Sequence, residues 1–430
     1  MFAHQIPFDP AHAAWEEIPA APGIFALFAA DERAEPYISR TPNLRRRIRR
    51  LLSARPDQTR RLQLAGRVAR IEYDRTGSDF EALLRLYTAS WTAFGDRARK
   101  RLHLRPPALL RMTVENAYPR VYVTNRVTQS AMEDLYGPFP SRVAAERFSE
   151  DMLDLFKLRR CVDDLHPDPA FPGCVYSEMK KCLAPCFRGC SDERYAEEAT
   201  AVRAFLRTRG ASLVEALRQE RDQASELMEF ERAADLHARL AKAEEVAAAA
   251  PDAVRTLAHL DAAIVQAAAE PEHVEIFRLI CGSLYGPALF SVQGMRRPNP
   301  DAGSSSLFAQ PVPQIEPVLL EARGVTVAPP DPLDLRLEKT LASLVPTPSH
   351  RRSARQNTGQ LADHLCLFGR WYYRPAARRI GEIVFAAEDG EVPPRALLRA
   401  IARVYQKQMS GSSPLIGDGG TSGTGLQAQS

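Results

Sequence analysis

The sequence predicts an α+β protein that is built from several domains. The chain has 430 residues, more than one typical domain needs. Short apolar runs with strand character alternate with segments whose apolar residues recur at helical spacing. Five of the seven cysteines fall between residues 161 and 190, which marks off a further module. Together these observations favour a small α/β domain, a cysteine-cluster module, a helical hairpin and a C-terminal α/β region of unknown type.

Composition limits the classes of protein to which the chain can belong. Hydrophobic residues make up 45% of it, enough for ordinary globular cores. The net charge is only +4, so a nucleic-acid surface must come from local clustering of basic residues. No stretch approaches the roughly 20 apolar residues of a membrane helix, and the N-terminus lacks a signal-peptide pattern. We therefore expect a cytoplasmic protein whose cysteines are thiols or metal ligands, not disulfides.

The first domain is expected over residues 15–127. Its strands are predicted at 23–28, from 37 onward, at 68–73 and at 118–127. Asn43 is the expected N-cap of an arginine-rich helix, and residues 80–91 form the second helix. The domain is thus a small α/β unit.

Three further regions and a tail follow along the chain. Residues 136–141 carry turn chemistry, and a helix from about 141 to 158 leads into the cysteines. Two long helical segments come next, and a change of apolar face near Glu229 predicts an antiparallel hairpin. Residues 273–294 are expected to form two strands around a Gly-Pro turn. The expected divisions are 136–195 for the cysteine-cluster module, 196–248 for the hairpin, 255–409 for the C-terminal region and 410–430 for a disordered tail.

The cysteine cluster has the spacing of a metal site. Cys161, Cys174, Cys182 and Cys186 follow the pattern C-x12-C-x7-C-x3-C, and Cys190 adds one more x3 step. Four thiolates can hold a [4Fe–4S] cluster or a tetrahedral zinc ion, and spacing does not separate the two. The alternative is a set of free, buried cysteines.

A basic helix follows Asn43. Its five arginines have no acidic residue among them and are Arg45, Arg46, Arg47, Arg49 and Arg50. Such a surface can bind phosphates, and its affinity would fall with salt. The alternative is an ordinary solvated helix face.

Several segments resemble the UvrC family, in the family's order. Pro22-Gly23-Ile24, Tyr37-Ile38 and Asn43-Leu44-Arg45 with Arg47 resemble its GIY-YIG nuclease domain, as does the later helix beginning Phe80-Glu81-Ala82. The run YGPFPS and the run LRRC to PGCVYSEMKKCLAPC resemble its cysteine module. LMEFERAADLHARL resembles the UVR motif. The resemblance covers about residues 15–247.

This resemblance implies repair of DNA together with protein partners. In the family, the four cysteines are associated with an iron–sulfur cluster, which favours [4Fe–4S] here with zinc as the alternative. The UVR motif implies a UvrB-like partner. The residues implied for it are Glu229, Phe230, Glu231, Arg232, Ala233 and Ala234. The residues implied for DNA are Arg40, Arg45, Arg46, Arg49 and Arg50.

The chain departs from the family at the nuclease site. Phe25 stands at the first catalytic tyrosine, Ser39 at a glycine and Leu86 at the metal-binding glutamate, while Tyr37 and Arg47 match. Phosphodiester attack needs an activated water and a cation to neutralise developing charge. Loss of two such groups predicts little or no cutting and no divalent metal at this site. The function expected is therefore that of a UvrC-like excision repair protein with a degenerate nuclease domain.

Two other functions stay open at this point. One is an active GIY-YIG endonuclease whose carboxylate lies elsewhere, if the alignment near Leu86 has slipped. The other is a protein-interaction adaptor without DNA binding, in which the hairpin is an ordinary helical pair. We recognise neither an RNase H-like domain nor helix-hairpin-helix motifs in the sequence, and no phosphate-binding loop of an ATPase.

Overall fold

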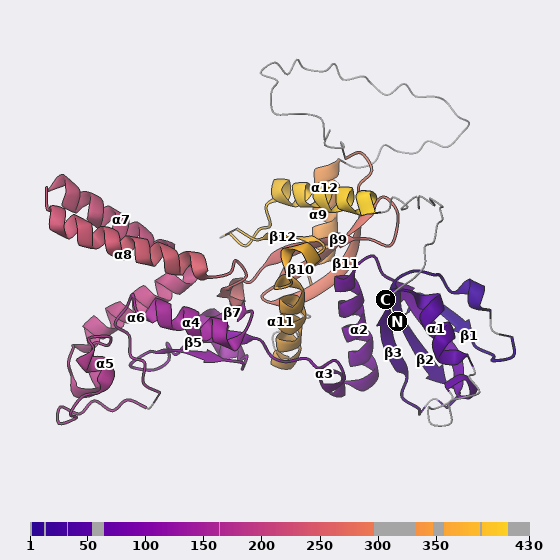
Figure 1. Ribbon diagram of the computed structural model, residues 1–430, viewed down its shortest axis with the longest axis horizontal. Helices are drawn as coiled ribbons and strands as arrows, with labels where there is room; N and C mark the ends of the chain where they lie inside the picture. Colours follow the sequence, from indigo (N-terminus) through magenta and orange to yellow (C-terminus); the bar gives the residue numbers. More distant parts are fainter. Residues whose placement is uncertain are drawn as a thin grey trace, which may run out of the picture.

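The structure is a computed structural model that mixes helices with antiparallel sheets (Figure 1). It describes residues 2–12, 14–31, 33–53, 64–162, 164–295, 332–346, 357–387 and 389–411. Within these residues the strands form three four-stranded sheets. The predicted α+β class is confirmed. In the same part of the chain, no helix has both the length and the apolar character needed to cross a membrane.

The first sheet has the strand order β1-β4-β2-β3 and is antiparallel. Its strands are β1 His4–Pro7, β2 Gly23–Ala29, β3 Tyr37–Thr41 and β4 Val68–Arg75. Helix α1, Leu44–Leu52, packs on one face through Leu44 and Ile48, beside the short helices η1 Trp15–Glu17 and η2 Leu64–Gly66. Helix α2, Asp79–Phe94, packs on the other face. Asn43 caps α1 by accepting a hydrogen bond from the Arg46 amide at 2.9 Å, as predicted.

The second sheet has the order β6-β5-β7-β8. Its strands are β5 Ala108–Met112, β6 Val121–Thr124, β7 Leu135–Phe139 and β8 Arg255–Thr256. Helices α4, Arg142–Leu153, and α6, Asp192–Arg207, pack with it in one apolar core. The short helix α3, Arg97–Arg101, precedes this sheet in the chain. The short helix η3, Gln129–Asp134, connects β6 to β7. The sheet therefore joins residues on both sides of the boundary expected between 127 and 136.

The turn expected at 136–141 is wrong, because most of this segment is the buried strand β7. Gly137 and Pro138 together stand opposite Leu109, since Phe139 pairs with Ala108 and Tyr136 with Leu110. This is a β-bulge, where proline fits because an extra residue leaves the ladder unpaired. Gly137 has a φ of 154°, which other residues rarely adopt, and a Cβ atom there would lie 2.5 Å from Cδ2 of Leu109, so glycine fits this position.

Two helices of the middle region form the predicted hairpin. They are α7, Ala211–Glu226, and α8, Phe230–Ala249, which extend away from the sheets (Figure 1). Leu217, Leu236 and Leu240 are buried between them. The cysteine region before α6 has only short helices, α5 Val175–Glu178 and η4 Pro185–Phe187.

The third sheet gives the C-terminal region its architecture, with the order β11-β10-β9-β12. Its strands are β9 Ala262–Ala267, β10 His273–Ile280, β11 Ser283–Ser291 and β12 Glu382–Phe385. Helix α11, Thr358–Tyr372, covers one face, and α9, Leu333–Ser343, and α12, Pro394–Gly411, cover the other. In the chain, the short helix η5, Leu257–His259, precedes β9, and the short helix η6, Ala376–Arg378, precedes β12. The tail expected from 410 onward falls outside the described residues beyond Gly411.

The Gly-Pro turn expected between β10 and β11 is also wrong. The chain turns at Cys281 and Gly282, whose φ angles of 48° and 77° are those of a two-residue hairpin turn. Gly286 and Pro287 lie within β11 and stand together opposite Phe277. As in β7, a Gly-Pro pair marks a bulge and not a turn.

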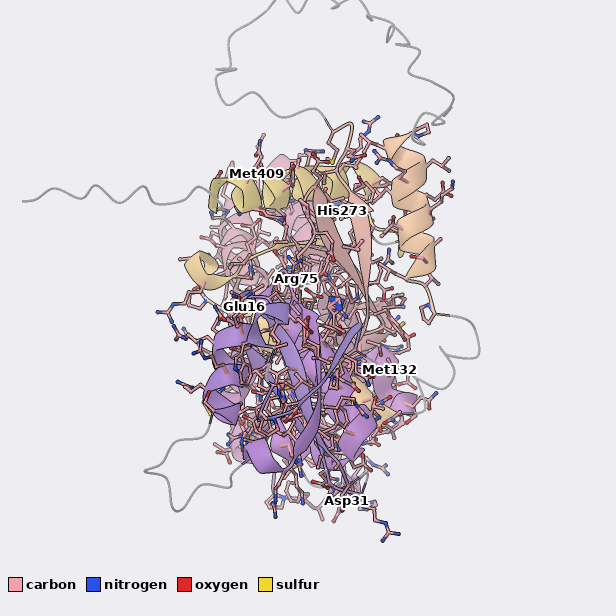
Figure 2. All side chains as sticks on the ribbon, turned by 90° about the vertical axis from the view of Figure 1, so that its right-hand side faces the viewer. Glu16, Asp31, Arg75, Met132, His273 and Met409 are labelled. Carbon is pink, nitrogen blue, oxygen red and sulfur yellow. The ribbon has the colours of Figure 1, made fainter. Side chains whose placement is uncertain are left out.

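Helix α2 joins the first and third sheets. Its Ala82 and Leu86 face the first sheet, while Phe80 and Tyr87 belong to the core that also contains Phe277. The Phe80 and Phe277 rings meet edge to face at 5.0 Å. Arg75 at the end of β4 donates to the Ala269 carbonyl at 3.1 Å, and Figure 2 shows Arg75 on the side toward His273 of the third sheet. The two sheets thus share a core through α2.

Candidate functional site

The arginines of α1 are divided by their contacts. Leu44, Ile48 and Leu52 are buried, which turns the arginines toward the other sides of the helix. Arg45 is used internally, because its Nε donates to the Ile18 carbonyl at 2.7 Å and its guanidinium pairs with Glu16 at 2.8 Å. Arg45 therefore fixes the segment before β2 against α1.

The remaining exposed arginines of α1 surround a hollow. Arg46, Arg49 and Arg50 line a cavity of about 420 Å³ together with Asn43 and Arg45. In the part of the chain that the structure describes, none of the three has a carboxylate within salt-bridge distance, and the first turn of α1 holds no acidic residue. A concave surface of unneutralised guanidinium groups attracts phosphate.

Arg40 and Arg47 lie apart from this hollow. Arg40, on β3, forms an ion pair with Asp79 at 3.5 Å, and Arg374 pairs with the same carboxylate at 3.3 Å. Arg47 is half-buried on α1, with its amide bonded to the Asn43 carbonyl. Arg40 is thus tied to the start of α2 and is less available to an anionic ligand than the exposed arginines of α1.

The remnant of the predicted nuclease site is largely apolar. Phe25 is fully buried in the core under α1, with its ring 6.1 Å from that of Tyr37. Tyr37 lies on the edge strand β3 and borders a hollow of about 430 Å³ with Glu35 and Arg101. Ser39 pairs with Phe25 across β2 and β3. The structure therefore brings Phe25, Tyr37 and Ser39 together, but only Tyr37 offers an exposed polar group beside the hollow.

Leu86 lies on the opposite face of the first sheet from Phe25. It packs with Ile24 and Ala82, and successive strand residues point to opposite faces, so Ile24 and Phe25 face different helices. Glu81, earlier on α2, accepts from the Gly77 amide before the helix at 2.7 Å and from Arg85 of the helix at 2.5 Å, and it lies beside Glu275 of the third sheet. Neither position supplies a carboxylate beside Tyr37.

Four of the clustered cysteines lie near one another. Burial is the largest cause that raises the pKa of Cys182, to about 11, and the thiols of Cys161, Cys174 and Cys186 raise it further. The Ala184 amide donates to the Cys182 sulfur at 3.3 Å. Cys174 sits at the start of α5 and Cys186 in η4, so short helices position both.

Four thiols are the kind of donor set that binds a [4Fe–4S] cluster or a zinc ion. All four side chains are partly buried, and an arginine contact is added by Arg159, whose guanidinium lies 3.5 Å from the Cys161 sulfur. Hydrogen bonds to sulfur are a regular part of iron–sulfur sites. Among the described residues, no three His, Cys, Asp or Glu side chains are yet closed around one metal-sized position.

The segment expected to bind a partner lies at the tip of the helical hairpin. Leu227, Met228 and Phe230 are 68%, 74% and 69% exposed there. Glu229 and Arg232 pair with each other at 2.8 Å, and Ala233 packs partly against the core of the hairpin. Glu231 and Ala234 are exposed. Three large apolar side chains in water at one tip form a surface that a partner can cover.

Comparison with known proteins places the middle of the chain in a family. Residues 108–205 match the model of the UvrC/Cho excinuclease, middle domain. This range runs from β5 almost to the end of α6 and includes the cysteine cluster. The chain is related to the UvrC family. The family resemblance predicted from the sequence is therefore confirmed.

Curated UvrC proteins match the chain over part of their length. UvrABC system protein C of Ectopseudomonas mendocina (strain ymp) is 28% identical over 226 residues, 50% of this chain and 35% of the relative. That of Symbiobacterium thermophilum is 28% identical over 282 residues, 64% of this chain and 44% of the relative. That of Xylella fastidiosa (strain Temecula1) is 30% identical over 50% of this chain and 34% of the relative. The chain thus spans less than half the length of these relatives, and no solved structure matches it.

Several features of the site gave no signal in the sequence. The internal role of Arg45 depends on a carbonyl in a separate segment, and the contact of Glu81 with β10 joins residues far apart in the chain. The apolar packing of Leu86 was not foreseen, because the apolar side predicted for α2 contained Phe80, Leu83 and Tyr87, which belong to the core shared with the third sheet.

Proposed function

We propose that this UvrC relative acts in nucleotide excision repair by binding DNA and a UvrB-like partner, without cutting at the site around Tyr37. The observation that carries the DNA-binding part is the hollow bordered by Arg46, Arg49 and Arg50. Three exposed guanidinium groups on one short helix, without a carboxylate partner among the described residues, attract the phosphates of a DNA backbone. The relatives' shared name, a protein of the UvrABC system, supports the repair context.

The absence of cutting follows from the residues at two positions. Phe25 has no hydroxyl to assist an attacking water, and Leu86 has no oxygen to bind a metal. Both side chains are buried in apolar cores, so neither position has space for a metal and its water ligands. The domain then serves as a DNA-holding module.

The cysteine module would hold a metal group through Cys161, Cys174, Cys182 and Cys186. A [4Fe–4S] cluster is the group that the resemblance implies, and zinc is the alternative with the same ligands. When bound, the group would cross-link the loops between α4 and α6. A rigid module of this kind would fix the second sheet relative to the hairpin.

The hairpin tip would be the partner surface. Phe230 and Met228 supply apolar area, and Glu229 to Ala234 supply the segment that resembles the UVR motif. Exposed aromatic and methionine side chains are common at the centre of protein interfaces. A UvrB-like helical pair is the partner that this chemistry fits.

The test combines binding and incision. A labelled lesion-bearing duplex is incubated with the full chain, with and without UvrA and UvrB, in magnesium or manganese. We expect no incision, together with duplex binding whose affinity falls as salt rises. The variant Arg46→Ala/Arg49→Ala/Arg50→Ala should bind more weakly and with a shallower salt dependence, by about 0.9 in slope for each phosphate that the variant no longer neutralises.

A matched control is available on α12. Arg395, Arg399 and Arg403 are also exposed on one helix, and their triple alanine variant should bind the duplex as the wild type does. Incision that disappears with Arg47→Ala would instead establish an active endonuclease. Salt-independent or absent duplex binding, with partner binding intact, would establish the adaptor.

A further inference from the structure

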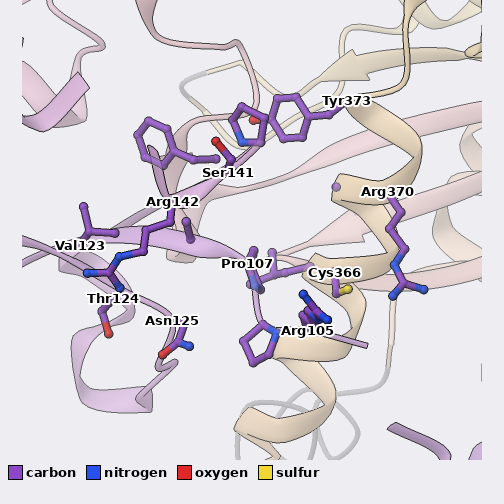
Figure 3. A pocket seen from close by; sticks show the side chains of 16 residues that line it. Arg105, Pro107, Val123, Thr124, Asn125, Ser141, Arg142, Cys366, Arg370 and Tyr373 are labelled. Atoms are coloured by element: carbon purple, nitrogen blue, oxygen red, sulfur yellow. The ribbon is translucent and has the colours of Figure 1, made fainter. Parts of the chain in front are cut away.

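A cavity of about 510 Å³ lies between the second sheet and helix α11 (Figure 3). One wall comes from β6, β7 and the start of α4, and the other comes from α11. The segment 105–107 runs along its floor. Its size falls in the range of small-molecule sites, and none of the arginines, cysteines or hairpin residues discussed above lines it.

The lining is cationic. It contains Arg105, Arg142 and Arg370 and no acidic side chain. Arg370 is already bonded, since its guanidinium donates to the carbonyls of Leu102 and His103, and it therefore braces the wall. The other two guanidinium groups are the candidates for binding an anion.

Arg105 and Arg142 can both turn to a ligand at little cost. Arg105 is exposed and forms no salt bridge within the described part of the chain. Arg142 pairs with Glu146 at 2.7 Å, but both side chains are exposed and four residues apart on one helix. Pairs of this kind contribute well under about 1 kcal/mol, so a phosphate can replace the glutamate.

The start of α4 adds a second source of positive potential. Ser141 caps this 12-residue helix by accepting from the Ala144 amide at 3.1 Å, and the first turn holds no acidic residue. Ser141 and Arg142 both line the cavity, and Figure 3 shows them on the same side as Thr124 and Asn125. The N-terminal end of α4, with the positive end of its dipole, therefore borders the cavity.

The rest of the lining combines apolar side chains with the polar side chains of Thr124, Asn125 and Tyr373. Pro107 lies on the floor, Val123 and Phe139 belong to the sheet side, and Leu365 and Cys366 belong to α11. A ligand that fits therefore has an anionic group for the arginines and a body that packs on these apolar side chains and hydrogen-bonds with Thr124 or Asn125. These are the two parts of a nucleotide.

We propose that this cavity binds a single nucleotide, with its phosphate at Arg142 and the start of α4 and its base against Pro107 and Cys366, beside Arg105. The nucleotide has two possible sources, a free nucleoside monophosphate or the 5′-phosphorylated end of a DNA strand. For the second source, the inference rests on the proposed function in DNA repair.

Titration calorimetry on the full chain tests this with three probes. They are deoxyadenosine monophosphate, a short single-stranded oligonucleotide with a 5′-phosphate, and the same oligonucleotide without it. We expect the 5′-phosphate to lower the Kd of the oligonucleotide. The variant Arg105→Gln/Arg142→Gln should remove that difference, with a rise in Kd of roughly tenfold or more.

Arg147→Gln is the matched control, because Arg147 lies on the same helix as Arg142 but does not line the cavity. It should bind all three probes as the wild type does, and thermal unfolding of each variant verifies the fold. Binding of the monophosphate alone identifies a free nucleotide, and binding of the phosphorylated oligonucleotide alone identifies a DNA end.

Equal affinity for the two oligonucleotides, together with no binding of the monophosphate at millimolar concentration, overturns the inference. That result would leave duplex binding through Arg46, Arg49 and Arg50 intact, so the two proposals fail separately. Absence of salt-sensitive duplex binding by the wild type, with the 5′-phosphate effect retained, would overturn the proposed function and leave this inference standing.

Discussion

Glu81 of α2 and Glu275 of β10 meet in the buried seam between the first and third sheets. The two residues are only 1% and 2% exposed. Arg85 donates to Glu81 at 2.5 Å and pairs with Asp74 at 3.4 Å, so one guanidinium serves several carboxylates. Burial, and then the neighbouring Glu81, raises the pKa of Glu275 to about 9. Glu275 is therefore protonated at neutral pH.

This protonation predicts that stability falls as pH rises. The folded pKa of Glu275 lies above the unfolded value of 4.5, so its contribution is fully present below pH 4.5 and is lost as pH rises through about 9. Between these two pKa values, the free energy of unfolding should fall by about 1.4 kcal/mol for each pH unit. Urea unfolding of the wild type and Glu275→Gln at a series of pH values measures this.

The Glu275→Gln variant should show a flatter profile and a higher unfolding midpoint than the wild type at pH 8 to 9. Glu338→Gln, an exposed position on α9, is the control and should follow the wild type. If the free energy of unfolding depends on pH in the same way for the wild type and Glu275→Gln, the Glu275 carboxyl does not bind a proton on folding.

Restoring the two family residues at the nuclease remnant should not restore cutting. Leu86→Glu places a carboxylate in an apolar contact with Ile24 and Ala82, on the face of the sheet away from Phe25. An unpaired buried charge costs roughly 3 to 5 kcal/mol. Phe25→Tyr/Leu86→Glu should therefore lose stability in thermal unfolding and show no metal-dependent incision.

Leu86→Met conserves volume and serves as the control, with an expected loss below about 1.5 kcal/mol. A double variant as stable as the wild type that cuts DNA in magnesium would show that position 86 reaches the hollow beside Tyr37. The replacements at positions 25 and 86 would then account by themselves for the loss of cutting.

The ion pair between Arg99 and Asp363 should hold α11 to the segment after α2. The guanidinium contacts both carboxylate oxygens, at 2.7 and 3.1 Å, and the Tyr87 hydroxyl donates to the same carboxylate at 3.2 Å. Asp363 is buried, so Arg99→Ala leaves a buried carboxylate without its cation, at a cost of roughly 3 kcal/mol.

Arg97→Ala is a suitable comparison for Arg99→Ala, because Arg97 lies two residues away and its pair with Glu35 is exposed. We expect a change of less than about 1 kcal/mol in that variant. Equal urea midpoints for the two variants would show that the buried pair contributes no more than a surface pair.

The sequence predicted features that depend on neighbours in the chain. The cap at Asn43, the apolar side of α1 and the hairpin near Glu229 follow from spacing alone. Both Gly-Pro pairs were wrongly predicted to be turns, because a bulge is defined by the partner strand and not by the strand that contains it. The contact of Glu81 with Glu275 and the cavity beside α11 join distant segments, and neither leaves a periodic pattern.

Loss of one clustered cysteine should remove the metal group. Iron, sulfide and zinc analysis of anaerobically purified protein, with its visible absorption, distinguishes an iron–sulfur cluster from colourless zinc. Cys182→Ser should abolish binding, since its thiol lies among those of Cys161, Cys174 and Cys186. Cys281→Ser, at the turn of the third sheet, should keep the full metal content. Full metal content in Cys182→Ser would place the site elsewhere, and Cys190→Ser would then be the next variant to examine, because Cys190 lies near Cys186.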